Sequence, residues 1–225
     1  MNKTLEQLKN MKKTILLFLL TLGFTTICSA QIETIEVDAK GIFSEIEVDK
    51  HNETISLLQS ADKEQKKETI EIVLKNPNDF NPPVLYALSQ ELFQQGDKEN
   101  AFFWFYVAQL RARYDVNLCM DNSAKQAVSV LNNKYGPEIN KSAFQDIDKL
   151  EKTVNKVVEF VRTNNENYDH RWINLHGLWA FQAGLSDETE SGELSKPKDE
   201  WEAIKKKTVD DYYNGFIDYV KTLKK

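Results

Sequence analysis

Cysteine is nearly absent from this chain, since only Cys28 and Cys119 occur among its 225 residues. Two cysteines cannot make the multiple disulfides that hold small secreted domains together, and no CxxC pair is present to bind zinc or exchange disulfides. A cysteine without a partner is more often a small buried hydrophobic residue than a nucleophile. The sequence therefore excludes a disulfide-stabilised scaffold and a metal or redox site built on paired cysteines.

Catalytic and cofactor signatures are missing as well. The sequence contains no HExxH, no Walker phosphate loop and no GxSxG, the short patterns that place metal ligands, phosphate-binding amides or a nucleophilic serine. We expect no metal site and no cofactor.

Glycine and proline are scarce, with eight and five residues. Lysine, glutamate, leucine and alanine are plentiful instead, which favours an all-α fold. A hydrophobic content of 41%, with twelve phenylalanines and eight tyrosines, is enough for a substantial core. A chain of 225 residues usually forms one domain.

Basic residues are outnumbered by acidic ones, and the formal net charge is −6. The first 30 residues carry four lysines and one glutamate, a charge of +3, so the remainder carries −9. This argues against nucleic acid or an anionic membrane as the main partner.

The one long apolar run lies near the N-terminus and resembles a secretory signal. Met11 is followed by two lysines, residues 14–24 are apolar, and Cys28-Ser29-Ala30 matches a cleavage site. We expect residues 1–30 to be a signal peptide and Gln31 to be the first residue after cleavage. The run is too short to span a bilayer, so no membrane span remains after cleavage.

Residues 31–52 alternate between apolar and acidic side chains around Gly41. This pattern predicts a short extended or β-hairpin N-terminal arm. Residues 53–75 have helical periodicity with a polar middle that divides them into two helices, and residues 53–225 are predicted to form a single α-helical domain.

The most informative stretch is residues 81–113, which read as a helical hairpin. Asn81 is a suitable N-cap, Gly96 a suitable left-handed stop, and Asp97 a cap for the second helix. Small and apolar residues recur at helical spacing: Leu85, Leu88, Ser89 and Leu92 before the turn, and Ala101, Phe105 and Ala108 after it. This spacing resembles a tetratricopeptide or Sel1-like repeat unit, although Arg113 stands where that family has a closing proline. The resemblance implies protein binding on a helical surface.

The remaining sequence predicts further helices over residues 122–135, ended by Gly136-Pro137, and over 142–162, with a heptad-like apolar seam. Residues 168–181 place Trp172, His176 and Trp179 on one helical face. An acidic loop at 186–194, expected to be mobile, precedes a last helix that starts near Trp201.

Three clusters are candidates for function. The first follows the hairpin and can bind a carboxylate or phosphate through arginine forks, or can pair internally to hold the next helix, which we favour: Arg111, Arg113, Asp115, Asn117 and Asp121. The second has the side chains of acid–base catalysis: Asp169, His170, Arg171, Asn174 and His176. Adjacent helical residues do not face each other, however, and two histidines six residues apart lie on different faces, so His176 is expected to be interior.

The third cluster is a run of five aromatic residues at 102–106. Five consecutive side chains point all around a helix, so the helix is either buried on several sides or shows Phe103 or Tyr106 to a partner. Burial is the favoured interpretation.

Together these features predict an all-α, helical-repeat-like array of about six to eight helices. The expected function is protein–protein interaction, with another protein as partner, in the periplasm or outside the cell. The alternatives are an inhibitor or immunity-type protein, and a hydrolase using His170 or His176 with Arg111 and Arg113.

Overall fold

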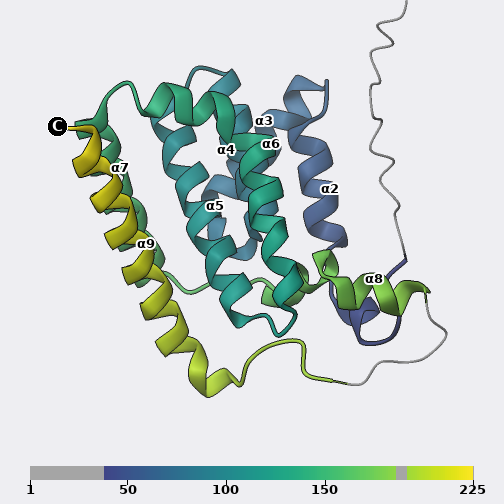
Figure 1. Cartoon of the computed structure of the whole chain (residues 1–225). Helices are drawn as coiled ribbons and strands as arrows, with labels where there is room; N and C mark the ends of the chain where they lie inside the picture. The colour runs from purple at the N-terminus through teal and green to yellow at the C-terminus, as the bar shows by residue number, and fades with distance from the viewer. Residues whose placement is uncertain (1–37, 186–191, 225) are drawn as a thin grey trace, which may run out of the picture. The chain divides into compact units, whose positions relative to one another are not determined.

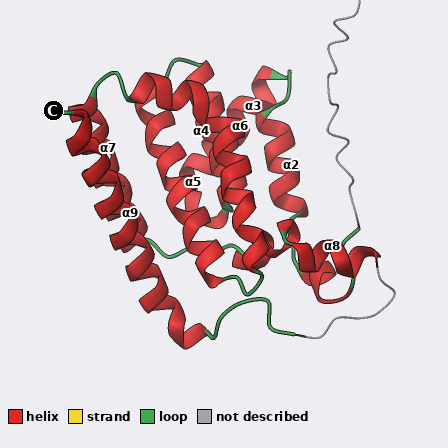
Figure 2. Cartoon of the chain, in the orientation of Figure 1, coloured by secondary structure: helices red, strands yellow, loops and turns green. Residues whose placement is uncertain are grey.

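The computed structural model describes residues 38–185 and 192–224, and in these ranges every regular element is helical (Figure 2). The prediction of an all-α fold is confirmed. The eight α-helices of these ranges are α2 (Asp49–Leu58), α3 (Lys63–Lys75), α4 (Pro82–Gln94), α5 (Lys98–Leu118), α6 (Gln126–Ala143), α7 (Ile147–Thr163), α8 (Leu178–Leu185) and α9 (Trp201–Leu223). Short 3-10 helices join them: η1 (Gly41–Glu45), η2 (Pro77–Asp79), η3 (Asn122–Lys125), η4 (His170–His176) and η5 (Lys198–Glu200).

The hairpin of α4 and α5 forms where its capping residues predict it. The Asn81 side chain accepts from the backbone N–H of Val84, and Asp97 accepts from that of Asn100. Gly96 has a φ of 87°, the left-handed conformation that glycine adopts without strain. The second helix continues to Leu118, beyond the predicted end at residue 113.

Helix α5 lies at the centre of the bundle, in contact with α4, α6, α7 and α9 (Figure 1). Ala101, Phe105 and Ala108 are fully buried, so the small residues let neighbouring helix axes approach closely. Of the five aromatic residues at 102–106, four are buried and Phe103 is half-buried against Phe160. Burial on several sides, the interpretation favoured for this run, is confirmed.

Two other predicted features also form. Residues 53–75 divide into two helices as predicted, but the break lies at residues 59–62, and the predicted polar middle, 62–68, lies mostly inside α3. The Asp62 side chain caps α3 through the N–H groups of Glu64 and Gln65. The apolar seam of α7 is buried at Leu150, Val154, Val157 and Val161.

The predicted helix end at Gly136-Pro137 is wrong, because α6 continues through both residues to Ala143. Gly136 lies against the buried ring of Phe105, where a Cβ atom would be 3.1 Å from Cζ. The flanking Tyr135 and Ile139 are also buried. This packing outweighs the roughly 3 kcal/mol intrinsic cost of an internal proline. The next helix, predicted over residues 142–162, consequently begins later, at Ile147, with Asp146 as its N-cap.

The predicted extended or hairpin arm is also wrong for its described part, residues 38–52. Those residues form η1 and the start of α2, and Phe43 and Ile46 pack against Ala180 and Ala183 of α8. Burying these two apolar side chains in a cluster replaces the strand alternation that the sequence indicates. Residues 31–37 of the arm and the predicted signal peptide, 1–30, lie outside the described residues.

The predicted acidic loop lies mostly outside the described residues, at 186–191. Its last residue, Leu194, is buried and its carbonyl accepts from the N–H of Met120. Among the described residues, no helix has both the length and the apolar composition needed to cross a bilayer.

Candidate functional site

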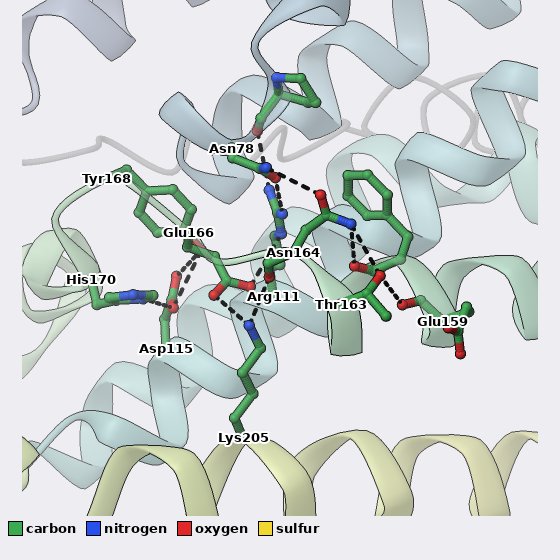
Figure 3. Close-up of polar contacts among 12 residues, drawn as sticks. Asn78, Arg111, Asp115, Glu159, Thr163, Asn164, Glu166, Tyr168, His170 and Lys205 are labelled. Atoms are coloured by element: carbon green, nitrogen blue, oxygen red, sulfur yellow. Dashed lines mark hydrogen bonds and ion pairs between the residues drawn. The ribbon is translucent and has the colours of Figure 1, made fainter. Parts of the chain in front are cut away.

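Two charged side chains one turn apart on α5, Arg111 and Asp115, have no exposed surface. A buried charge costs several kcal/mol unless it is paired and hydrogen-bonded. The predicted pairing of the first cluster, in which the arginines bind Asp115 and Asp121, does not form. Both side chains instead bind residues far away in the sequence (Figure 3).

Asp115 accepts hydrogen bonds from three side chains of the segment that follows α7. Trp172 donates its Nε1–H to Oδ2 at 2.6 Å, Tyr168 donates its hydroxyl to Oδ2 at 3.1 Å, and Nδ1 of His170 lies 2.6 Å from Oδ1. Burial raises the pKa of Asp115, while the His170 charge and the hydrogen bonds from His170 and Trp172 oppose that rise.

His170 is surrounded by aromatic rings. The ring centroids of Tyr114, Tyr168 and Trp201 lie 5.3, 4.9 and 5.2 Å from that of the imidazole. Burial alone would lower the pKa of His170, but the Asp115 charge and hydrogen bond outweigh it and raise the pKa above 6.5. Next to Asp115, the His170 imidazole therefore keeps its proton to a higher pH than a free histidine would.

Arg111 binds on three sides. Its guanidinium donates to the carbonyl of Pro77 at 3.1 Å and to Oδ1 of Asn78 at 2.5 Å, and its Nε lies 3.5 Å from Oε1 of Glu166. It also lies over the ring of Phe160, 5.3 Å from the centroid. Arg111 therefore joins α5 to η2 and to the segment after α7.

Glu166 is the second carboxylate of this network. Lys205 of α9 donates to its Oε2 at 2.7 Å and also to the carbonyl of Asn164 at 2.9 Å. Figure 3 shows Arg111 and Lys205 reaching this carboxylate from different helices. Arg111 and Lys205 thus neutralise Glu166 in the interior, and His170 pairs with Asp115. These pairs give the arrangement of a structural anchor between α5, α9 and residues 164–172.

A cavity of about 630 Å³ opens beside this network. Glu166, Tyr168 and His170 line one side, and Ser195, Lys196 and Trp201 line another. Arg111 is not among its lining residues and has no exposed surface, so it cannot contact a ligand bound there.

The residues required for the hydrolase interpretation are not brought together. Arg113 is exposed and lies over the Tyr212 ring, in a different hollow from the one beside His170. The expectation that His176 is interior is wrong, since the predicted helix is interrupted by η4 and His176 is exposed at its end, beside Trp172.

The other predicted site residues are bound within the fold. Asp169 pairs with Arg171, with Oδ2 to Nη2 at 2.7 Å, and both line the cavity beside His170. Asn174 is buried, and its Oδ1 is 3.0 Å from the Cys119 thiol. Asn117 donates to Thr208 at 2.8 Å.

Asp121 and Tyr106 are both buried. Asp121 accepts from the Ser123 hydroxyl at 2.6 Å and from the N–H of Trp179 at 2.9 Å, so it fixes the start of α8. Tyr106 donates its hydroxyl to Asn140 at 2.9 Å. The alternative in which Tyr106 faces a partner is therefore wrong, and Phe103 is half-buried within an aromatic cluster.

The network residues that sequence reasoning did not find are Asn78, Glu166, Tyr168, Trp172 and Lys205. Asn78, Tyr168 and Trp172 bind partners that lie 33 to 57 residues away in the sequence. The available signal was the Arg111–Asp115 spacing of one turn. It places two opposite charges on one helix face only if the second helix of the hairpin is continued beyond its predicted end at residue 113.

Four large apolar side chains of the short helix α8 are exposed. We call Met120, Leu178, Trp179, Phe181 and Leu185 the α8 surface; their exposed fractions are 41, 59, 39, 40 and 67%. Met120 belongs to it because it lines a hollow of about 530 Å³ together with Trp179. None of these residues stood among the candidates drawn from the sequence, because an apolar helix reads as a core element.

No known protein family, curated protein or solved structure matches this chain.

Proposed function

We propose that this chain is an exported protein-interaction module that binds a partner protein through the α8 surface. The observation that carries the proposal is the orientation of α8. Its small residues, Ala180 and Ala183, face the fold and pack against Phe43, whereas four large apolar side chains face outward.

This orientation is the reverse of an ordinary surface helix, which buries its large apolar residues. Fully burying one such side chain is worth roughly 1.5–3 kcal/mol, so exposing four on eight residues is costly unless a partner covers them. The α8 surface therefore has the composition of an interface core, with an aromatic anchor in Trp179.

The surface is held in place before any partner arrives. The N–H of Leu178 donates to the Ser123 hydroxyl at 2.7 Å, and the N–H of Trp179 donates to Asp121. A preordered surface loses less conformational entropy on binding, which favours affinity.

The chemistry of the partner follows from the hollow beside Trp179. Among the described residues that line it, Glu193 is the only charged one, and the remaining walls include Ile42, Met120 and Leu194. We infer a partner segment that inserts an apolar side chain and carries a basic residue next to it. A second copy of this chain is a poor occupant, because the formal charge of −9 that remains after cleavage before Gln31 makes two copies repel each other.

The tetratricopeptide resemblance of residues 81–113 is compatible with protein binding, but it does not supply the surface. Most side chains of α4 and α5 are buried by their neighbours. The hairpin is better understood as a structural support: Asp115 of α5 binds His170 and Trp172, which lie in the segment that precedes α8.

The test is photocrosslinking in the cells that make the protein, with benzoylphenylalanine placed at Phe181. Val130 provides a matched control, since it is apolar, 61% exposed and located on α6. We expect one protein to be captured from position 181 and not from 130. The same adducts from both positions, adducts with the chain itself, or adducts with lipid would overturn the proposal.

A further inference from the structure

A separate hollow of about 480 Å³ lies where α5, α6 and α9 meet. It shares no residue with the α8 surface. Arg113, Asn132 and Tyr212 line it together with Val116, Asn117, Lys125, Val128, Ser129, Thr208 and Asp211.

The guanidinium of Arg113 is preorganised in this hollow. It lies over the Tyr212 ring, 5.6 Å from the centroid, and in the described part of the chain it forms no ion pair. The one acidic lining residue, Asp211, pairs with Lys207 instead. A stacked arginine with a free fork is well suited to bind a planar anion through two parallel hydrogen bonds.

The polar floor of the hollow also directs a donor toward this space. The Oδ1 atom of Asn132 accepts from the Tyr86 hydroxyl at 2.8 Å and from Nε2 of Gln109 at 2.9 Å. Gln109 is fixed in turn because its Oε1 accepts from Tyr212 at 2.9 Å. Since its oxygen is occupied twice, the Asn132 side chain is left with its NH2 group to donate.

The charges of the hollow favour a monoanion. Arg113 and Lys125 contribute two positive charges, and Asp211 contributes one negative charge at the same rim. Asp211 repels a phosphate dianion about twice as strongly as a carboxylate at the same place, so the fork of Arg113 and a nearby cation favour the carboxylate. Val116 and Val128 add an apolar wall that suits an aliphatic group attached to the carboxylate.

We propose that this hollow binds a carboxylate that carries a small aliphatic group. Arg113 binds the carboxylate through its fork, the Asn132 amide donates a further hydrogen bond, and Lys125 supplies the second positive charge. Both a peptide C-terminus and a free aliphatic acid have this chemistry. Val116, Asn117 and Lys125 also line an adjoining hollow of about 360 Å³, which gives a longer ligand room to extend.

The proposal is tested by titrating the protein at pH 7 and constant ionic strength while following the side-chain NMR signals of Arg113 and Asn132. The probes are sodium isovalerate, sodium phosphate and sodium chloride. Acetyl-Ala-Ala-Val as the free acid and as the C-terminal amide separates the two sources of carboxylate.

Saturable shifts with isovalerate or with the peptide acid are expected, and little change with chloride, phosphate or the amide. Arg113→Ala should weaken carboxylate binding at least about ten-fold, since a charge-assisted pair is lost. Arg113→Lys keeps the charge but not the fork, so its affinity for the carboxylate should lie between those of the wild type and Arg113→Ala.

Arg162→Ala is the matched control, because Arg162 is a partly exposed arginine outside the hollow that pairs with Asp210. Equal loss in Arg113→Ala and Arg162→Ala, or equal shifts with chloride and isovalerate, would overturn the proposal. Tighter binding of the peptide acid than of isovalerate assigns the site to a peptide, and the reverse assigns it to a free acid. Neither result depends on the α8 surface.

Discussion

Replacing Arg111 with methionine tests whether the buried network holds the bundle together. The substitution keeps an apolar stem of similar length but removes the guanidinium, its bonds to Pro77 and Asn78, and its pairing with Glu166. Removing one partner of a buried pair costs about 3–5 kcal/mol, because the other charge remains buried without full compensation. Lys205 still contacts Glu166, which places the expectation toward the lower end of this range.

The assay is equilibrium urea unfolding followed by tryptophan fluorescence and by circular dichroism, with wild type and variant at one pH and ionic strength. Arg162→Met is the control, since Arg162 is a partly exposed arginine whose pair with Asp210 is open to solvent. Exposed pairs contribute about 0–1 kcal/mol. A cost below about 1 kcal/mol for Arg111→Met, or a cost equal to that of Arg162→Met, would refute the reasoning.

Three further predictions follow from the same structure. The pKa of His170 is raised above 6.5 in the folded state, so its contribution to the free energy of unfolding is full below pH 6.5 and is lost as pH rises through the folded pKa; urea unfolding across this range should show that slope in wild type and not in His170→Gln. Gly177→Ala should cost about 1–3 kcal/mol, because its Cβ would overlap the buried Asp121 carboxylate, whereas Gly215→Ala, in open space within α9, should stabilise by about 0.5–1 kcal/mol in the same assay. Intact-mass measurement of the exported protein should place the N-terminus at Gln31; a mass that includes Met1 or Met11 would contradict export by a cleaved signal.

Local signals in the sequence were sufficient for the central hairpin. Asn81, Gly96 and Asp97 act within three residues of themselves, so their capping roles could be predicted without knowledge of the fold. The seam of α7 was predictable for a similar reason, since its spacing alone defines a buried face.

Features that depend on contacts between distant residues were not predictable. Gly136 and Pro137 carry the local signal of a helix end, but packing of Gly136 on Phe105 overrides it. The sequence shows only that the adjacent Asp169 and His170 do not face each other, and it does not reveal that His170 pairs with Asp115, 55 residues away. Periodicity says which residues share a face, but it does not say which faces meet.

The charged residues that are buried are not the residues to which we assign binding. Arg111 and Asp115, which the sequence offers as binding residues, stabilise the interior. The exposed residues on which the two binding proposals rest lie elsewhere, at the α8 surface and at Arg113.

The central claim is that the α8 surface binds a protein, and it is tested most directly by affinity. The protein captured from position 181 should be purified and its Kd measured for wild type, Trp179→Ala and Val130→Ala. Trp179→Ala should weaken binding by roughly thirty-fold or more, the cost of removing an interface anchor of about 2 kcal/mol, while Val130→Ala should leave the Kd unchanged. An unchanged Kd in Trp179→Ala would contradict the account.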